Sequence, residues 1–266
     1  MTIFTASVQS LPNEFAAGPD NEFLVKSGSI AAGDVGGQIY YPSGQRIAIF
    51  DDFIGDAMNV QWNIVEGTDS ATSAESILAG GIGGVLRLTT GDAGTGLAAD
   101  MIQLTQALQW QASNGDLCIE VRAKLSAITV CYCFIGFTDV VTLEAPIESA
   151  SSANTLTSNA TDAVGFMFDT RMTADTWWLV GVATDVDATH QNTGSAPVAD
   201  TYATFRVEVS SAGVATFYYN GAQVGTTMTG AVTAAADLTP TIAVSKTATA
   251  ASMTMDNDYI HVAMLR

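Results

Sequence analysis

Basic residues are scarce in this sequence. Its 266 residues include nine Lys and Arg against 27 Asp and Glu, so the formal net charge at pH 7 is −18. Binding to nucleic acid needs clustered Lys and Arg that neutralise phosphates, and docking on anionic lipid needs a similar patch. The composition therefore predicts a protein that binds neither nucleic acid nor a membrane.

Long apolar runs are missing as well. No segment reaches the ~18 consecutive apolar residues that a membrane-spanning helix needs. The first residues, Met1 to Ala6, contain neither a basic cluster nor a continuous apolar stretch. A secretory signal peptide has both features, so none is expected here.

Cysteine and histidine are few. Cys131 and Cys133 are alternate residues of an expected strand, so both thiols point to one face, and a disulfide between them would strain the backbone. Cys118 could pair with either only from a neighbouring strand. We expect three reduced thiols, buried as small apolar groups. Because His190 and His261 are the only histidines, no transition-metal site is expected.

The common catalytic motifs are absent too. The sequence has no Gly-x-Ser-x-Gly elbow and no Gly-x-x-x-x-Gly-Lys loop, and none of its eight glutamates lies in a Glu-x-Asp-x-Glu run. Glu120 and Glu208 lie two residues from Arg122 and Arg206, which favours solvated cross-strand ion pairs. These absences predict that the protein is not an enzyme and has no catalytic residues and no cofactor.

Three pairs of aspartates make calcium the one metal ion that this chain could bind. Asp51-Asp52, Asp185-x-Asp187 and Asp256-x-Asp258 could contribute oxygen ligands from converging loops, and calcium takes six to eight oxygens. No twelve-residue EF-type loop is present. A structural calcium ion and plain solvated turn aspartates both remain open.

The residues that are abundant predict β-structure. About 48% of the chain is hydrophobic, enough for a folded core. From Arg46 onward, short apolar runs recur about every ten residues between Gly, Asn, Asp and Ser turns. In Asp116–Leu125 apolar and polar residues alternate, as in a half-buried strand. Asn220-Gly221 between two such runs is a strong hairpin signal. Only Gly96–Leu108 has room for a short helix.

These patterns predict an all-β protein, an antiparallel β-sandwich or jelly roll, preceded by an N-terminal arm or small subdomain. We expect the sandwich to span residues 46–266, with long polar loops at 144–163 and 185–200. Residues 1–45 are rich in turn signals and too short to bury a core alone. Their apolar groups therefore need either a partner or the sandwich itself to pack on: Phe4, Phe15, Phe23, Leu24, Tyr40 and Tyr41.

Several segments carry a resemblance to a known family. Phe50-Asp-Asp-Phe53, followed by Trp62 and by Gly83–Leu88, resembles the opening of concanavalin A-like (laminin G-like) jelly rolls. Thr204–Gly225, with its strand, turn, aromatic strand and Asn-Gly, is similar to a hairpin of that fold. Together with Val164–Asp169 and Thr176–Gly181, these segments resemble the sandwich domains of tailed-bacteriophage virion proteins, including capsid decoration proteins and fibres.

The resemblance implies a structural role in a virion. It implies a decoration (cement) protein, made in the host cytoplasm, that binds the outside of the capsid and stabilises it. The expected partners are the major capsid protein, contacted through residues 1–45, and further copies of the chain, in a trimer that would suit three-fold positions. The glucanase branch of the superfamily has the Glu-x-Asp motif that this chain lacks, and no metal ligand of the lectin branch matches.

A second interpretation is a lectin-like carbohydrate-binding module of a tail fibre or a secreted protein. Trp177 and Trp178 are neighbours in an expected strand, so one ring should face the core and the other should face outward. An outward indole could contact a host-surface glycan or another subunit.

Overall fold

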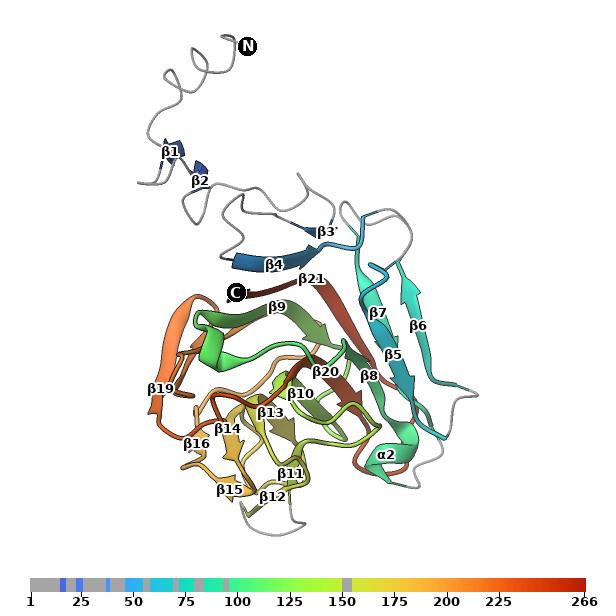
Figure 1. Ribbon diagram of the computed structural model, residues 1–266. Helices are drawn as coiled ribbons and strands as arrows, with labels where there is room; N and C mark the ends of the chain where they lie inside the picture. The colour runs from blue at the N-terminus through green and yellow to red at the C-terminus, as the bar shows by residue number, and fades with distance from the viewer. Residues whose placement is uncertain are drawn as a thin grey trace.

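Two antiparallel β-sheets make up almost all of the structure (Figure 1). This computed structural model describes residues 15–17, 23–25, 37–38, 46–54, 58–68, 72–78, 84–92, 96–149 and 155–266. Within these ranges, sheet I has the strand order β15-β14-β13-β10-β20-β8-β5, with β16 also paired to β14. Sheet II has the order β19-β18-β17-β9-β21-β4-β3, with β7 paired to β21 and β6 paired to β7.

The strands and short helices have the following bounds. Sheet I contains β5 (Asn63–Glu66), β8 (Ile102–Thr105), β10 (Tyr132–Thr138), β13 (Ala163–Asp169), β14 (Trp178–Ala183), β15 (Val186–Asp187), β16 (Gln191–Asn192) and β20 (Thr239–Ser245). Sheet II contains β3 (Gly37–Gln38), β4 (Arg46–Asp51), β6 (Ala74–Ile77), β7 (Leu86–Thr89), β9 (Leu117–Leu125), β17 (Ala203–Val209), β18 (Ala215–Tyr219), β19 (Ala222–Met228) and β21 (Thr254–Leu265). Outside both sheets lie the pair β1 (Phe15–Ala17) and β2 (Phe23–Val25), the hairpin β11 (Ile147–Ser149) and β12 (Leu156–Ser158), the helix α2 (Leu97–Asp100) and the 3₁₀ turn η1 (Ala112–Asn114).

The main core lies between the two sheets. Sheet II contributes the apolar positions of its alternating strands, such as Ile119 and Val121 of β9, which are fully buried, while the residues between them are only partly buried. Aromatic rings dominate the centre. Phe166 of sheet I meets Phe205 and Phe217 of sheet II edge to face, at centroid distances of 5.4 and 5.6 Å. Such pairs add a favourable electrostatic term to burial of apolar area.

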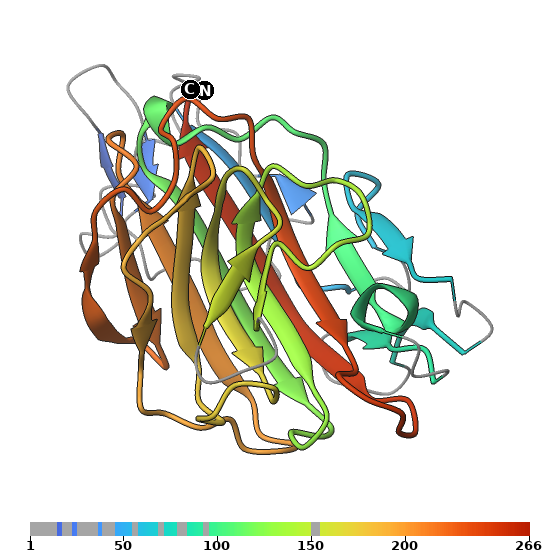
Figure 2. The same cartoon turned by 90° about the horizontal axis from the view of Figure 1, so that it is seen from below.

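Sheet I is also covered on its other side. The segment that contains the β11–β12 hairpin packs there, in front of the strands in Figure 2. A second apolar cluster lies under it and includes Tyr132 and Phe134 of β10 and Val180 of β14. Consequently all seven residues of β10 and all seven of β13 are buried. A strand buried on both faces has a nearly continuous apolar sequence, whereas apolar and polar residues alternate in the strands of sheet II.

The predicted fold class is confirmed: the chain forms an all-β, antiparallel sandwich of jelly-roll type. At the expected hairpin, Asn220 and Gly221 have φ values of 50° and 79°, the positive angles that this tight turn requires. The three cysteines are free and buried, as expected. Within the described ranges, no helix is long and apolar enough to cross a membrane.

Some local expectations differ from the structure. The segment 96–108 holds only the four-residue helix α2 and then continues as strand β8. The two polar loops contain short strands, β11 and β12 in the first and β15 and β16 in the second. Strand β4 begins at Arg46, and β3 precedes it and pairs with it. The division into an arm of residues 1–45 and a domain of residues 46–266 stays a prediction.

The central aromatic contact gives a stability test. Phe166 is fully buried, so Phe166→Ala leaves a cavity and removes two ring contacts. We expect the free energy of unfolding to fall by about 3–5 kcal/mol, measured by urea denaturation. Val186→Ala is the control, because Val186 is 67% exposed and should change stability by less than about 0.5 kcal/mol. Equal losses in the two variants would contradict the described core.

Candidate functional site

A pocket of about 640 Å³ opens on the hairpin side of sheet I, beside α2. Its wall combines apolar and polar groups from segments that are far apart in the sequence. The lining residues are Thr68, Gly96, Leu97, Ala98, Ala99, Leu143, Glu148 and Arg171. The volume lies inside the range of about 300–1,000 Å³ that is usual for small-molecule sites. This pocket is the candidate functional site.

The charged part of the pocket is a cluster of Arg171 with two carboxylates. Arg171 follows β13 in a turn and folds back onto Asp169, the last residue of that strand. Its Nε donates to Asp169 Oδ1 at 3.0 Å, and its Nη2 donates to Asp169 Oδ2 at 2.7 Å. The same Nη2 donates to Glu148 Oε2 of β11 at 2.7 Å. One guanidinium therefore joins the end of β13 to the hairpin.

The hairpin that carries Glu148 is fixed to sheet I by further hydrogen bonds. The Ser149 amide donates to Asp169 Oδ2 at 2.9 Å. The buried Tyr132 hydroxyl donates to the carbonyl of Ile147 at 2.8 Å. Gln103 of β8 donates to the carbonyl of Glu144 at 2.7 Å. These contacts give Glu148 a defined position at the pocket.

Burial and charge act in opposite directions on Arg171. Partial burial by itself lowers the pKa of the guanidinium, but the hydrogen bonds and charges of Asp169 and Glu148 outweigh burial and raise the pKa above its ordinary value. The group therefore stays charged at any physiological pH. The side chain of Asp169 is fully buried, whereas those of Arg171 and Glu148 are about one quarter exposed. Asp169 thus positions Arg171, and the other two can meet a ligand.

This arrangement suits a ligand rich in hydroxyl groups. Glu148 offers carboxylate oxygens as acceptors, Arg171 is a charged donor, and Thr68 adds a hydroxyl at the wall. Leu97 and Leu143 provide apolar surface beside them. A few placed polar groups on a partly apolar wall are typical of small-molecule recognition.

The six apolar residues predicted to contact a capsid or another partner cannot be placed as a surface. Phe4, Tyr40 and Tyr41 lie outside the described residues. Phe15 belongs to β1, and Phe23 and Leu24 belong to β2; these two strands pair with each other, with Ala16 opposite Leu24. Their part in a contact stays a prediction.

The two tryptophans proposed for glycan contact are both buried. Trp177 is 3% exposed and meets Phe205 edge to face in the main core at a centroid distance of 4.6 Å. Trp178 is 8% exposed and belongs to the cluster under the hairpin. The rings do point to opposite faces of sheet I, as expected, but the outward face is covered here. Neither ring forms an open platform, and glycan contact through them stays a prediction.

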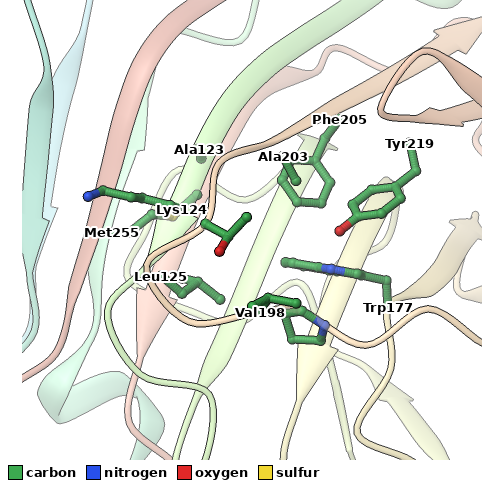
Figure 3. Close-up of a pocket in the computed structure, with 11 residues that line it drawn as sticks. Ala123, Lys124, Leu125, Trp177, Val198, Ala203, Phe205, Tyr219 and Met255 are labelled. Atoms are coloured by element: carbon green, nitrogen blue, oxygen red, sulfur yellow. The ribbon is translucent and has the colours of Figure 1, made fainter.

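A small cavity lies beside Trp177. Figure 3 shows the indole between Val198 and Phe205, with the hydroxyl of Tyr219 directed toward it. The cavity measures about 20 Å³, which is room for about one water molecule. It is too small for a sugar ring.

Three of the aspartates considered for calcium have protein partners. Asp51 accepts the backbone N–H groups of Phe53 and Asn59, at 3.0 and 3.1 Å, and burial raises its pKa. Asp256 and Asp258 form ion pairs with arginines. Among the described residues, no group of three or more His, Cys, Asp or Glu could hold a metal ion. Calcium binding stays a prediction.

Comparisons with known proteins agree on the fold. No protein-family model matches the sequence, and no curated protein sequence matches it. The structure is similar to a β-glucanase from Bacillus licheniformis, with a TM-score of 0.55 and 13% identity over 81% of this chain and 97% of that one. A laminarinase from Flavobacterium sp. UMI-01 gives a TM-score of 0.52 and 11% identity, over 80% and 97%. A protein of unknown function from Shewanella oneidensis MR-1 gives 0.52 and 14%, over 83% and 87%.

These similarities confirm the concanavalin A-like jelly roll as the class of fold, and at such low identity they show the fold alone. They also correct the prediction that the protein is not an enzyme, because many of the similar structures are glycoside hydrolases. That prediction relied on carboxylates close together in the sequence. The fold instead brings together Glu148 and Asp169, which lie on different strands. Nothing in the comparisons connects the chain with bacteriophage virions, so that part of the resemblance stays a prediction.

This cluster is not among the site residues predicted from the sequence. Glu148 lies in a segment interpreted as a polar loop, and Arg171 was not singled out. One signal of the cluster is present in the sequence, because Asp169-Thr-Arg171 stands at the end of a continuous apolar strand. Ion pairs of this kind are needed where a charged group lies at the end of a buried strand.

The cluster predicts unequal effects on stability. Asp169→Ala removes a fully buried acceptor and leaves the Ser149 amide and Arg171 without it, so we expect a loss of about 3 kcal/mol or more in the free energy of unfolding. Glu148→Gln changes a partly exposed pair and should cost less than about 1 kcal/mol. Thermal and urea unfolding of both variants measure the difference. A smaller effect at Asp169 than at Glu148 would contradict the described geometry.

Proposed function

We propose that the protein binds carbohydrate in the pocket beside α2. The observation that carries the proposal is a pocket of about 640 Å³ in which Arg171 and Glu148, held by a buried Asp169, stand beside leucine side chains. Sugar hydroxyls both donate and accept hydrogen bonds, and the pocket offers a charged donor and a charged acceptor side by side.

The fold supports the same class of ligand. The structures of similar fold include proteins named as a β-glucanase and a laminarinase. Fold alone does not assign a function, so the proposal depends on the pocket. The lectin-like alternative from the sequence is retained, but its binding site moves from the tryptophans to Glu148 and Arg171.

Binding can be tested with two pocket variants. Glu148→Ala removes an acceptor, and Ala98→Trp fills the pocket from the exposed side of α2. We expect each to weaken binding at least tenfold, measured by affinity electrophoresis in a panel of soluble polysaccharides and by calorimetry. Glu75→Ala is the matched control, because Glu75 is exposed on β6. Absence of binding by the wild-type chain, or equal binding by all variants, would overturn the proposal.

Glycoside hydrolysis is a second candidate, favoured by the two carboxylates on one guanidinium. Glu148 Oε2 and Asp169 Oδ2 each lie 2.7 Å from Arg171 Nη2, so they cannot be further apart than twice that distance. Hydrolases of retaining type use two carboxyl groups about 5 Å apart that both reach the sugar. Asp169 is fully buried, so in this chain only Glu148 can act on a substrate, as an acid or base, while Asp169 holds the guanidinium.

Hydrolysis can be tested by release of reducing ends from β-glucans and galactans. If Glu148 is a catalytic acid or base, Glu148→Gln should lower the rate by about 100-fold or more, while Glu75→Gln should leave it unchanged. Binding without any release of reducing ends would assign the pocket to binding alone.

The virion role is a separate proposal that the sequence resemblance supports. In that role the chain is a decoration protein on the capsid, anchored on the major capsid protein by residues 1–45. Co-sedimentation with capsids tests it, and loss of co-sedimentation on deleting residues 1–45 would support the anchoring role.

A further inference from the structure

The outward side of sheet II differs in composition from the rest of the surface. It carries five of the chain's nine Lys and Arg residues, on β4, β7, β9 and β17: Arg46, Arg87, Arg122, Lys124 and Arg206. It also carries the rings of Tyr202, Tyr218 and Tyr259. We call this surface the Arg–Tyr face. Arg and Tyr are enriched at protein interfaces and among their energetically dominant residues.

Strand register aligns part of this face into one row. Tyr218 lies opposite Arg206, Arg206 opposite Glu120, Glu120 opposite His261, and His261 opposite Phe50. The row crosses five neighbouring strands, from β18 to β4. Each of these side chains is partly exposed. The face is therefore a continuous sheet surface rather than a set of scattered side chains.

A bulge in β21 keeps this face polar along its length. The register of β21 against β9 shifts between Asn257 and Tyr259. As a result Asp256 lies opposite Lys124 and Tyr259 lies opposite Arg122, so both belong to the outward side. Without the extra residue, one of the two would point into the core.

The side chains of the face hold one another in place. Arg87 makes two hydrogen bonds to the buried Asp256, at 2.7 and 2.9 Å, and Arg122 lies 4.4 Å from the centre of the Tyr202 ring. Tyr259 donates to Glu120 at 2.8 Å. Ordered side chains lose little conformational entropy when a partner binds.

The net charge of this face differs from that of the remaining surface. Its five basic residues meet the acids Glu120, Glu208, Asp256 and Asp258, and two more acids lie at its edges, Asp116 near Arg46 and Asp200 near Arg87, so the face is close to neutral. The chain as a whole carries −18, so the rest of the molecule holds nearly all of the excess negative charge. Two copies repel one another through most of their surfaces and repel least when these two faces meet.

We propose that the Arg–Tyr face is the interface of a two-fold homodimer. In an isologous contact the same patch meets itself, and a patch of alternating acids and bases complements itself. The five strands of the row, at ~4.8 Å spacing and about 23 Å of strand length, give a footprint of roughly 550 Å² on each copy. The two copies together then bury about 1,100 Å², near the lower end of the range of about 1,200–2,000 Å² for stable interfaces. The inference does not depend on the proposed carbohydrate binding.

The test is sedimentation of the full chain at concentrations from 0.1 to about 50 μM. We expect wild-type protein to reach the mass of a dimer. The double variant Arg206→Gln with Tyr218→Ala should raise the dissociation constant at least 100-fold, because Arg and Tyr anchors each contribute strongly at interfaces. The control is Thr157→Glu, which makes the net charge more negative by one, as Arg206→Gln does, but on the exposed β12 strand.

Circular dichroism and urea unfolding establish that the variants are folded. A dimer that Thr157→Glu keeps and the double variant loses supports the proposal. A wild-type monomer at 50 μM overturns it, whether the face is then covered by another segment of the chain or left for a different partner. A trimer, or a dimer that survives the double variant, also overturns it, because the contact then lies elsewhere.

Discussion

Coverage of sheet I on both faces is the constraint on which the structure depends. Its central strands β10 and β13 are buried along their whole length, so neither side of the sheet can face water. Sheet II covers one side, and the hairpin segment covers the other. The hydrogen bonds that Tyr132 and Gln103 donate, and the one that Asp169 accepts from the Ser149 amide, hold that segment in place. The same contacts create the candidate site, because they bring Glu148 to Arg171.

The two sheets have different roles because their outer surfaces differ. The outer side of sheet I is an apolar cluster under the hairpin, with a pocket beside α2. The outer side of sheet II carries paired charges and partly exposed tyrosines. A single sandwich thus offers a concave pocket for a small ligand on one side and a broad surface for a macromolecular contact on the other.

Carboxylates can meet in a β-fold without being close together in the sequence. A motif search detects acids that alternate along one strand, since those point to one face. It cannot detect Glu148 and Asp169, which come from a hairpin and from the sheet beneath it. Their shared guanidinium is visible only when the hairpin has packed. The absence of a local motif therefore says little about which acidic groups this fold can gather.

Local sequence patterns are sufficient to predict the class of fold. The alternation in Leu117–Leu125 and the Asn220-Gly221 turn are local, because strand period and turn angles depend only on adjacent residues. The packing of the layers, in contrast, sets which surfaces stay open. Packing places a hairpin over Trp178, although the sequence of that hairpin predicts a polar loop. It also brings Arg171 to Glu148 and places the basic residues of four strands on one face. Those outcomes depend on register and layer packing, which join residues distant in the sequence and leave no local pattern.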